Sequence, residues 1–515
     1  MTNTWDAVII GAGTAGLSAA QMLGRSRRRI LMIDSGSPRN RFAAHMHGVL
    51  GLDGTAPAEL LERGRREARG YGVEIVSGSV TALSDIGDRI RVTREDGAVD
   101  SARAVVIATG IRDELPDIPG LAQGWGRTVL HCPYCHGWEV AGQRLGVLVT
   151  SPASIHQVEL VRQLSDEVTA FTAAAGPLNE ETIARLTARG IRLVASPVRE
   201  ASGDGDDLTL TTDDGAHVVD ALFVGGTPVI DLGFADDLDL AREDLPGAPL
   251  RVDLRGATSH PRVFAAGNAT APFGNVPLSM GAGSMAGAGA NAMLTTEDFD
   301  RAVAERTSQR NTEWEQRYAA AEQHVWSGRV NGTVGSLVSG LEPGTALDVG
   351  SGEGGDAVWL AEHGWRATGI DVSTTAVRRA TALAADHGVD ARFIVADGPA
   401  SIEREFDLVL ASFLHSWEPD FPRIRMLREA SDRVAPDGHL LIVSHAAPPP
   451  WADEAHGADD HGPIMRSPEE ELALLDLDPT VWRSEIVEVR RRATIAPDGA
   501  PAHLDDGVLL LRRVR

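Results

Sequence analysis

The stretch Ala7-Val8-Ile9-Ile10-Gly11-Ala12-Gly13-Thr14-Ala15-Gly16, near the start of the 515-residue chain, decides the fold of the first part. Its apolar run predicts a buried strand, and the glycines predict a tight turn into a helix. The next strand, Ile30-Leu31-Met32-Ile33, ends at Asp34. Such glycines let the backbone approach a pyrophosphate, the helix start supplies N–H donors, and the acidic residue can bind a ribose. We therefore expect an α/β fold of βαβ units that binds a dinucleotide, in preference to a tight turn without a ligand.

A second glycine-rich stretch, Asp348-Val349-Gly350-Ser351-Gly352-Glu353-Gly354, stands near the start of the last third of the chain. It again predicts a strand, a turn and a helix, the last beginning near Asp356. A following strand ends at Asp371, and Asp397 comes directly after another apolar run. The run Phe406-Asp407-Leu408-Val409-Leu410-Ala411-Ser412 predicts a further buried strand. These ordered elements predict a second nucleotide-binding α/β unit.

The only two cysteines lie between these stretches, in Cys132-Pro133-Tyr134-Cys135-His136-Gly137. In a reducing compartment, closely spaced cysteines indicate redox or metal chemistry and not a structural disulfide. Metal binding is the poorer interpretation, because a second cysteine pair is missing. A Cys-x-x-Cys pair at a helix start lowers the pKa of one thiol and places the other for intramolecular attack. His131 and His136 flank the pair and could carry its protons, or could simply pack.

Length and charge limit the possible partners. A chain of 515 residues is expected to form two to four folding units. Its net charge of −25 argues against nucleic acid or an anionic membrane as the main partner, because both are polyanions. No signal peptide pattern or membrane-spanning stretch is evident, so we expect a cytoplasmic protein.

Alternating β-branched runs and helical stretches predict an α/β unit near residues 5–113 and a second one from about Leu130 to Asp244, which carries the cysteines. A glycine-rich helix after it could return the chain to the first unit. A helical linker or cap at 298–325 then leads to a last domain at 326–515.

The first part resembles the thioredoxin-reductase-like flavoproteins, over roughly residues 5 to 297. The glycine turn, the strand end Ala108-Thr109-Gly110, the cysteine pair and the turn Phe264-Ala265-Ala266-Gly267 carry the resemblance in that order. In that family FAD lies across a split domain, and an inserted domain binds NADPH. The resemblance therefore implies an FAD domain in two parts, 1–113 and 245–297, and an inserted domain at 114–244. The resemblance implies FAD contacts at Gly11, Gly13, Thr14, Ala15, Gly16, Asp34, Asn40, Arg41, Val80, Ala108, Thr109, Gly110, Gly267 and Asn268. His45 and His47 lie in the same loop as Asn40 and are further candidates for flavin or substrate contact.

The inserted domain departs from thioredoxin reductases at its phosphate loop. This loop reads Thr150-Ser151-Pro152-Ala153-Ser154 and has no glycine. Side chains and a proline ring there crowd the backbone where a pyrophosphate must approach. A Cys-x-x-Cys-His motif without the NADPH loop resembles the dithiol oxidases of the gliotoxin and holomycin type. That resemblance implies oxidation of a small dithiol to a disulfide, with electrons passing through FAD to O₂, and a homodimer. It also implies that Cys132 exchanges with the substrate and that Cys135 faces the flavin.

The last part resembles class I S-adenosylmethionine-dependent methyltransferases. The resemblance implies that the glycines hold the methionine portion, Asp371 the ribose and Asp397 the adenine amine. Trp326 resembles part of the N-terminal cap of small thiol-methylating enzymes, although such an aromatic residue could equally belong to a core. His415 and Trp417 follow the fourth strand, where acceptor contacts usually arise. The implied S-adenosylmethionine contacts are Trp326, Asp348, Gly350, Gly352, Asp371, Asp397 and Ser412.

These features together predict a bifunctional enzyme that acts on sulfur compounds. Its flavin part oxidises a small dithiol with O₂, and its methyltransferase part methylates a thiol, as in natural-product tailoring or self-protection. One alternative is an NAD(P)H-dependent disulfide reductase fused to a small-molecule methyltransferase. Another is a flavin-containing regulatory module whose redox state controls methylation. The sequence identifies neither the dithiol nor the methyl acceptor.

Overall fold

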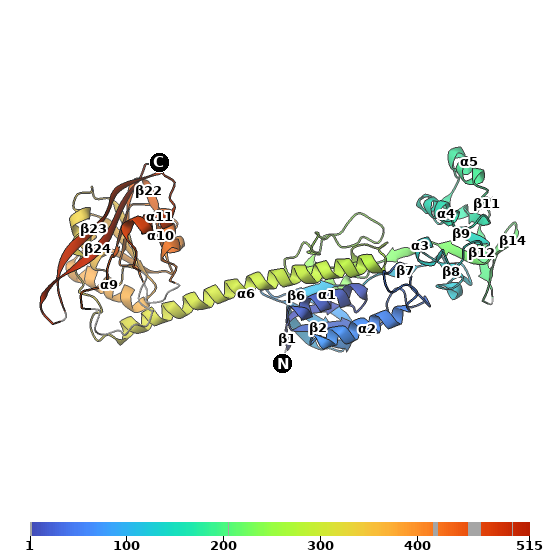
Figure 1. The fold of residues 1–515 in the computed structure, drawn as a ribbon, viewed down its shortest axis with the longest axis horizontal. Helices are drawn as coiled ribbons and strands as arrows, with labels where there is room; N and C mark the ends of the chain where they lie inside the picture. Colours follow the sequence, from blue (N-terminus) through green and yellow to red (C-terminus); the bar gives the residue numbers. More distant parts are fainter. Residues whose placement is uncertain (1–2, 204, 416–420, 452–464, 497, 515) are drawn as a thin grey trace. The chain divides into compact units, whose positions relative to one another are not determined.

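The structure, a computed structural model, describes residues 3–203, 205–415, 421–451, 465–496 and 498–514 (Figure 1). The chain divides into two compact units, residues 1–300 and residues 301–515. Both units are built on sheets flanked by helices, so the predicted α/β class is confirmed. In the part of the chain that is described, no helix is both long and apolar enough to cross a membrane.

The first unit contains a seven-stranded sheet in the order β3-β2-β1-β6-β5-β4, with β17 paired to β6. Its strands are β1 (Asn3–Ile10), β2 (Ile30–Asp34), β3 (Glu74–Ser77), β4 (Val80–Asp85), β5 (Ile90–Arg94), β6 (Val99–Ile107) and β17 (Val263–Ala265). Helices α1 (Thr14–Arg25) and α2 (Pro57–Gly70) belong to this part of the unit. Strand β1 is buried along most of its length and lies between β2 and β6 in parallel pairing, as a continuous apolar run predicts.

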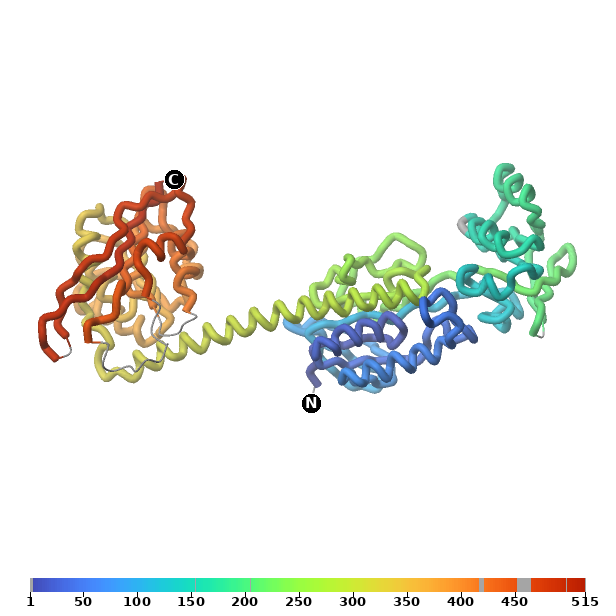
Figure 2. The backbone as a smooth tube through the Cα atoms, in the orientation of Figure 1, coloured from blue at the N-terminus to red at the C-terminus, as the bar shows by residue number. Residues whose placement is uncertain are grey.

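The chain leaves this sheet after β6 and returns to it with β17, a path that Figure 2 traces. Between them lies a five-stranded sheet in the order β11-β10-β9-β15-β8 and a three-stranded sheet in the order β12-β13-β14. The strands are β8 (Val129–Leu130), β9 (Leu145–Leu148), β10 (Val168–Phe171), β11 (Arg192–Val194), β12 (Val198–Ser202), β13 (Leu208–Thr212), β14 (Gly215–Val219) and β15 (Ala221–Val224). The helices are α3 (Pro133–His136), α4 (Ile155–Val161) and α5 (Glu180–Ala188). The strands just before and just after this inserted region, β7 (Arg112–Glu114) and β16 (Thr227–Val229), pair antiparallel with each other.

Helix α6 (Val276–Ala320) is 45 residues long. Its glycine-rich start packs closely against α1. The contact is so close that a Cβ at Gly283 would overlap the carbonyl oxygen of Ala15. A Cβ at Gly287 would likewise lie 2.7 Å from the carbonyl oxygen of Ala19. Residues 298–320 of the predicted helical linker or cap at 298–325 belong to this helix.

The second unit contains a seven-stranded sheet in the order β20-β19-β18-β21-β22-β24-β23. Strands β18 to β22 run parallel, and β24 is antiparallel to both of its neighbours, β22 and β23. The strands are β18 (Thr345–Val349), β19 (Arg366–Asp371), β20 (Arg392–Val395), β21 (Phe406–Ser412), β22 (Val434–His445), β23 (Trp482–Ile495) and β24 (Pro501–Arg513). The helices are α7 (Gly332–Val338), α8 (Gly355–Glu362), α9 (Thr374–His387), α10 (Arg423–Ser431) and α11 (Pro468–Leu475). The strand order changes direction at β18, so the carboxyl ends of β18 and β21 border the crevice where ligands bind such sheets.

Two candidate ligand sites and a disulfide

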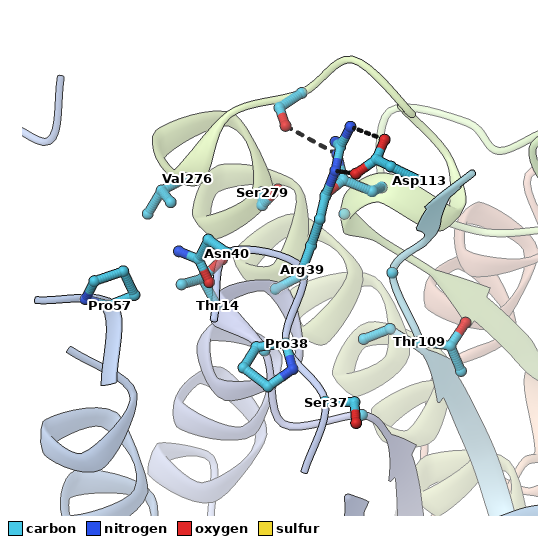
Figure 3. A pocket seen from close by; sticks show the side chains of 18 of the residues that line it. Thr14, Ser37, Pro38, Arg39, Asn40, Pro57, Thr109, Asp113, Val276 and Ser279 are labelled. Carbon is cyan, nitrogen blue, oxygen red and sulfur yellow. Dashed lines mark hydrogen bonds and ion pairs between the residues drawn. The ribbon is translucent and has the colours of Figure 1, made fainter. Parts of the chain in front are cut away.

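A cavity of about 480 Å³ lies at the carboxyl ends of β1, β2 and β6 in the first unit (Figure 3). The structure brings nearly all predicted residues of this unit to its wall. They are Gly11, Gly13, Thr14, Ala15, Asp34, Asn40, Val80, Ala108, Thr109, Gly110, His131, Cys132, Cys135, His136, Gly267 and Asn268. His45 and His47 also line it. Two predicted residues, Gly16 and Arg41, do not line the cavity.

The glycine turn has the close backbone packing that its sequence predicts. Gly11 has a φ of +101°, and a Cβ there would overlap the carbonyl oxygen of Ala108. A Cβ at Gly16 would overlap the carbonyl oxygen of Gly11, so Gly16 serves the packing of the turn and not the cavity wall. A Cβ at Gly13 would meet no described atom within 4 Å. The backbone is thus open to a ligand at Gly13, which fits a bound pyrophosphate.

Asp34 ends β2 at the cavity wall, as predicted, but it has protein partners already. Its Oδ1 accepts a hydrogen bond from the backbone N–H of Ala12 at 3.1 Å. Its Oδ2 accepts one from Nη2 of Arg65 at 2.9 Å. Arg65 also lines the cavity. It was not predicted from the sequence, because it lies on α2, most of whose side chains are not buried, and looks like a surface residue.

Arg39 holds three segments of the cavity wall together (Figure 3). Its Nε and Nη2 donate to the two carboxylate oxygens of Asp113 at 2.8 and 2.7 Å. Its Nη1 donates to the carbonyl oxygen of Pro272 at 2.7 Å. The bidentate pair fixes the loop after β2 against β7, and the third bond fixes it against the loop before α6. The sequence pointed to the neighbouring Arg41 instead.

Arg41, the other predicted residue of this loop, does not line the cavity. Its side chain is exposed, lies over the Phe42 ring at 4.2 Å, and donates to the carbonyl oxygen of Pro38 at 3.0 Å. Asn268 does line the cavity, but its Nδ2 donates to the carbonyl oxygens of Ala271, Pro272 and Gly274. The amide therefore shapes its own loop, which leaves only its oxygen side for a ligand hydroxyl.

Cys132 and Cys135 form a disulfide at the start of α3, on the wall of the same cavity. Burial is the main cause that lowers the pKa of His131, and the guanidinium of Arg39 lowers it further. Burial also lowers the pKa of His136, against the opposing effect of Glu139. Both imidazoles are therefore neutral at neutral pH and able to accept a proton from a thiol.

The loop at 150–154 does not offer the backbone cradle that a pyridine nucleotide needs. Residues Pro152–Ser154 form a short 3₁₀ turn. The hydroxyl of Ser154 lies 3.2 Å from that of Thr150 and 3.3 Å from that of Ser151. These side chains hydrogen-bond to one another at the place where a glycine-rich loop would present its N–H groups. The residues present do not fit a nicotinamide dinucleotide.

A second cavity, of about 840 Å³, lies in the second unit at the carboxyl ends of β18, β19 and β21. Every predicted residue of this unit's ligand site lines it: Trp326, Asp348, Gly350, Gly352, Asp371, Asp397 and Ser412. Gly350 and Gly352 have φ values of +71° and +52°, a backbone conformation that side chains disfavour. The turn thus requires glycine, and both glycines line the cavity.

Three carboxyl groups lie beside this glycine turn, and those of Asp348 and Asp371 are buried. Burial raises the pKa of Asp348 well above its usual value, and the neighbouring Asp356 and Asp371 raise it further. Burial also raises the pKa values of Asp356 and Asp371, against the hydrogen bonds that they accept. Asp371 accepts from the backbone N–H of Gly352 and Ser373, each at 2.9 Å. Such a cluster favours a ligand that carries positive charge. This fits the ammonium and sulfonium groups of S-adenosylmethionine.

The end of α6 and the segment after it form one wall of the second cavity. Glu315 accepts hydrogen bonds from Ser373 and Thr375 at the start of α9, which lower its pKa to about 2. The buried Glu353 accepts from the backbone N–H of Val325 and Trp326, each at 2.9 Å. These contacts hold the predicted cap on the domain. Sequence reasoning missed Glu353, although it lies inside the glycine stretch, because its partners are separated from it by 27 and 28 residues.

His415 lines the second cavity, as predicted for an acceptor contact, and His445 joins it there. Asn311 and Asp397 also meet at this cavity, since Nδ2 of Asn311 donates to Oδ1 of Asp397. The other predicted acceptor contact, Trp417, lies outside the described residues. His445 was not expected from the sequence, because it ends a strand and follows no recognisable motif.

Comparisons with known proteins assign each unit separately. The family model described as pyridine nucleotide-disulphide oxidoreductase matches residues 5–291, more than half of the chain. The model described as methyltransferase domain matches residues 346–438.

Relatives and solved structures cover the first unit. Thioredoxin reductase tcpT of Claviceps purpurea (strain 20.1) is 33% identical over 310 residues, which are 58% of this chain and 96% of that protein. Thioredoxin reductase sirT of Leptosphaeria maculans is 31% identical over 307 residues, which are 56% of this chain and 93% of that protein. The crystal structure of HlmI has a TM-score of 0.57 and 39% identity, and the match covers 60% of this chain and 99% of that one. The oxidoreductase from Agrobacterium tumefaciens has a TM-score of 0.55 and 36% identity, over 57% and 99% of the two chains.

The close-packed glycine turn and the disulfide on one cavity, with a second glycine turn on another, agree with these matches. FAD and S-adenosylmethionine are the cofactors that the two matched families imply. The chain belongs to the pyridine nucleotide-disulphide oxidoreductase family, as a thioredoxin-reductase-like flavoprotein joined to a methyltransferase domain.

Proposed function

We propose that this enzyme oxidises a small-molecule dithiol to a disulfide with O₂ as the acceptor, and methylates a thiol from S-adenosylmethionine. The first activity is supported mainly by the disulfide Cys132–Cys135 on the cavity of the glycine turn, in a chain whose 150–154 loop does not fit a pyridine nucleotide. In this proposal the electrons that reduce the flavin come from the substrate dithiol through the cysteine pair, and not from a pyridine nucleotide. We further propose a homodimer of the flavoprotein part and a cytoplasmic location.

The cysteine pair carries the oxidation in two exchanges. A substrate thiolate attacks Sγ of Cys132, which forms a mixed disulfide and releases Cys135 as a thiolate. The second substrate thiol then attacks the substrate sulfur of the mixed disulfide and releases Cys132. The substrate has lost two electrons and two protons, and the enzyme holds a dithiol. FAD held at this cavity would supply the acceptor for these two electrons, and O₂ would take them from it and be reduced to hydrogen peroxide.

The histidines beside the pair manage the protons. His131 and His136 are neutral at neutral pH, because burial lowers both pKa values. Either imidazole can therefore take a proton from the incoming substrate thiol and return it to a cysteine thiolate. His131 is oriented by a contact of 3.3 Å between its Nδ1 and the carbonyl oxygen of Val224.

The second cavity supports the methyl transfer mainly by position and charge. The turn at Gly350 and Gly352 brings its backbone to the cavity wall, and Asp371 lines the cavity beside it. S-adenosylmethionine, when bound, supplies a methyl group on a positively charged sulfur. Trp314 and Trp326 line the same cavity and exclude water from the reacting groups. Alignment and desolvation are most of what this reaction needs, since sulfur is already a good nucleophile.

Anaerobic flavin spectroscopy tests the oxidation. Dithiothreitol, and a panel of rigid small dithiols, should bleach the visible absorbance of the oxidised flavin, and O₂ should restore it. NADPH should leave the absorbance unchanged. The Cys132→Ser variant should keep its FAD but not be bleached, while Met22→Leu, on the exposed face of α1, should behave as wild type. A flavin that no dithiol bleaches would contradict the proposal.

Methyl transfer is tested separately with matched acceptors. Benzyl mercaptan should be methylated much faster than benzyl alcohol or benzylamine, because the thiol is the strongest nucleophile of the three. Preference for the alcohol or the amine would refute thiol methylation and leave the oxidase proposal standing.

A disulfide reductase that uses NADPH is the second candidate, favoured by the name of the matched family and of its relatives. Rapid anaerobic bleaching by NADPH, followed by reduction of a disulfide substrate, would favour it over the oxidase.

A further inference from the structure

Two histidines meet at the wall of the second cavity. His445 is the last residue of β22, and His415 follows the end of the neighbouring strand β21. Both strands run parallel, with Ser412 opposite Val443, so their carboxyl ends lie at the same edge. The two imidazole rings are 5.5 Å apart between centroids, edge to face, and both line the cavity.

The backbone between β21 and His415 is held in a costly conformation. Phe413 has a φ of +51°, in the left-handed region that non-glycine residues avoid, and its N–H donates to the carbonyl oxygen of Val443 at 2.8 Å. Its ring lies 4.4 Å from that of His445. The buried Arg423 donates to the carbonyl oxygen of Leu414, which fixes the residue before His415. Such a conformation persists only where the surrounding structure enforces it, and this is common at functional sites.

Two of the three arginines around the pair are matched with carboxylates, and the third, Arg317, lies over the rings of Trp314 and Trp326. Arg423 pairs with Glu471 at 2.6 Å, and Arg492 pairs with Asp506 at 2.7 Å. His445 faces both arginines and Asp506, while His415 faces His445, Arg423 and Arg317. A bound thiolate would have to compete with those carboxylates for the two paired arginines. A neutral thiol would not.

Both imidazoles are neutral at neutral pH. Burial is the main cause that lowers the pKa of His415 to about 4, and burial also lowers the pKa of His445. Among the described residues, the buried Nδ1 of His445 has no hydrogen-bond partner. A buried nitrogen without a partner is costly and rare, and it calls for a functional explanation. A neutral imidazole also avoids placing a positive charge beside the methyl donor's sulfonium.

We propose that His415 and His445 form the proton-accepting site of the methyltransferase, which binds the acceptor as a neutral thiol. The inference rests on the proposed thiol methylation. The bond between the thiol sulfur and the methyl carbon forms as the bond from that carbon to the donor sulfur breaks, and its electron pair remains on the donor sulfur. The thiol proton passes to an imidazole nitrogen of the pair. The thiol proton becomes strongly acidic as the thiol sulfur acquires positive charge. A weakly basic imidazole is therefore sufficient to accept it.

The dependence of kcat/KM on pH, measured with benzyl mercaptan, tests this role. An enzyme that needs a preformed thiolate loses activity about tenfold for each pH unit below the pKa of the thiol. The wild type should instead be nearly flat from about pH 6 to about pH 9. His415→Asn and His445→Asn should lose about 10²-fold or more at about pH 6.5 and regain activity as the thiol ionises. His387→Asn, an exposed histidine paired with Glu362, is the matched control and should follow the wild type.

Calorimetry provides a measurement that needs no turnover. Benzyl mercaptan is titrated at about pH 7 into enzyme loaded with S-adenosylhomocysteine, in two buffers of different ionisation enthalpy. Wild-type protein should release no net proton, and His415→Asn should bind the thiol about tenfold more weakly. Binding of S-adenosylhomocysteine within about threefold of wild type shows that each variant is folded. If one variant fails this check, the wild-type profile and proton count still decide.

The outcomes separate the two proposals. A wild-type rate that falls tenfold per pH unit, a release of about one proton per thiol bound, or asparagine variants with the wild-type profile would each overturn the role of the pair. Wild-type protein that methylates no thiol overturns the proposed function itself, and the inference falls with it.

Discussion

Arg39 should be the residue in the loop after β2 on which FAD binding depends most. Its guanidinium makes two hydrogen bonds to Asp113 and one to the carbonyl oxygen of Pro272. The Asp113 side chain is only 8% exposed and that of Arg39 is 22% exposed. Arg39→Met keeps most of the side-chain volume but leaves the Asp113 carboxylate buried without its partner. Loss of one member of a fully buried pair costs about 3–5 kcal/mol. The partial exposure of Arg39 reduces this to about 2–3 kcal/mol.

The affinity of the apoprotein for FAD measures this effect, through the quenching of flavin fluorescence on binding. If the loop must be reordered by FAD, a cost of about 2–3 kcal/mol corresponds to a dissociation constant raised roughly 30- to 150-fold. The dissociation constant of Arg39→Lys should lie between those of the wild type and Arg39→Met, because an ammonium group keeps the charge but not the bidentate geometry. The matched control is Arg41→Met in the same loop. Its side chain is exposed and stacks on Phe42, so FAD affinity should change by less than about threefold.

The Arg39 variant should also change the pH dependence of flavin reduction. The guanidinium lowers the pKa of His131, so Arg39→Met should raise it. If neutral His131 accepts the substrate proton, activity is lost as the pH falls through this pKa, and the acid limb moves to higher pH. Equal FAD affinities for Arg39→Met and Arg41→Met, or retention of wild-type affinity by Arg39→Met, would refute this account of the loop.

Three further predictions follow from contacts in the two units. Gly283→Ala should lower the stability of the flavoprotein by about 2 kcal/mol or more in thermal unfolding, because its Cβ overlaps a backbone oxygen of α1. Gly281→Ala, on the same helix, has open space around its Cβ and should raise the stability by about 0.5–1 kcal/mol. The Glu315 carboxylate stabilises the native state above about pH 4.5 and loses this effect as the pH falls towards about 2. Glu315→Gln should therefore be less stable than wild type at neutral pH, and the stabilities of the two proteins should become equal in acid denaturation curves. A fragment 301–515 should bind S-adenosylhomocysteine in calorimetry, and a fragment 326–515 should not, because residues from the end of α6 line the cavity.

The glycine turns could be predicted from the sequence because their requirements are local. Gly11 and Gly350 have positive φ values, and the strand before each is a short apolar run that pairs in parallel. These conditions depend on a few consecutive residues, so the pattern alone predicts the turn, the helix after it and the acidic residue at the next strand end. The same reasoning located every predicted residue of the second cavity.

The choice between Arg39 and Arg41 could not be made from the sequence. The two arginines lie in one loop with similar neighbours, and only the fold decides which of them meets Asp113, 74 residues away. His445 and Glu353 were missed for the same reason. Their partners come from other strands or from the cap, and no local pattern indicates such a contact. The predicted domain limit at 297 likewise falls inside α6, because a helix that serves two units shows no break in its helical pattern.

Both cavities contain histidines that burial keeps neutral, and this common feature has a chemical reason. In the flavoprotein these are His131 and His136, and in the methyltransferase they are His415 and His445. A thiol must lose its proton in disulfide exchange and in methyl transfer alike. A lysine would already be protonated at neutral pH, and a charged carboxylate would repel a developing thiolate. A neutral imidazole avoids both problems, so the proposed thiol chemistry calls for the same kind of residue in both units.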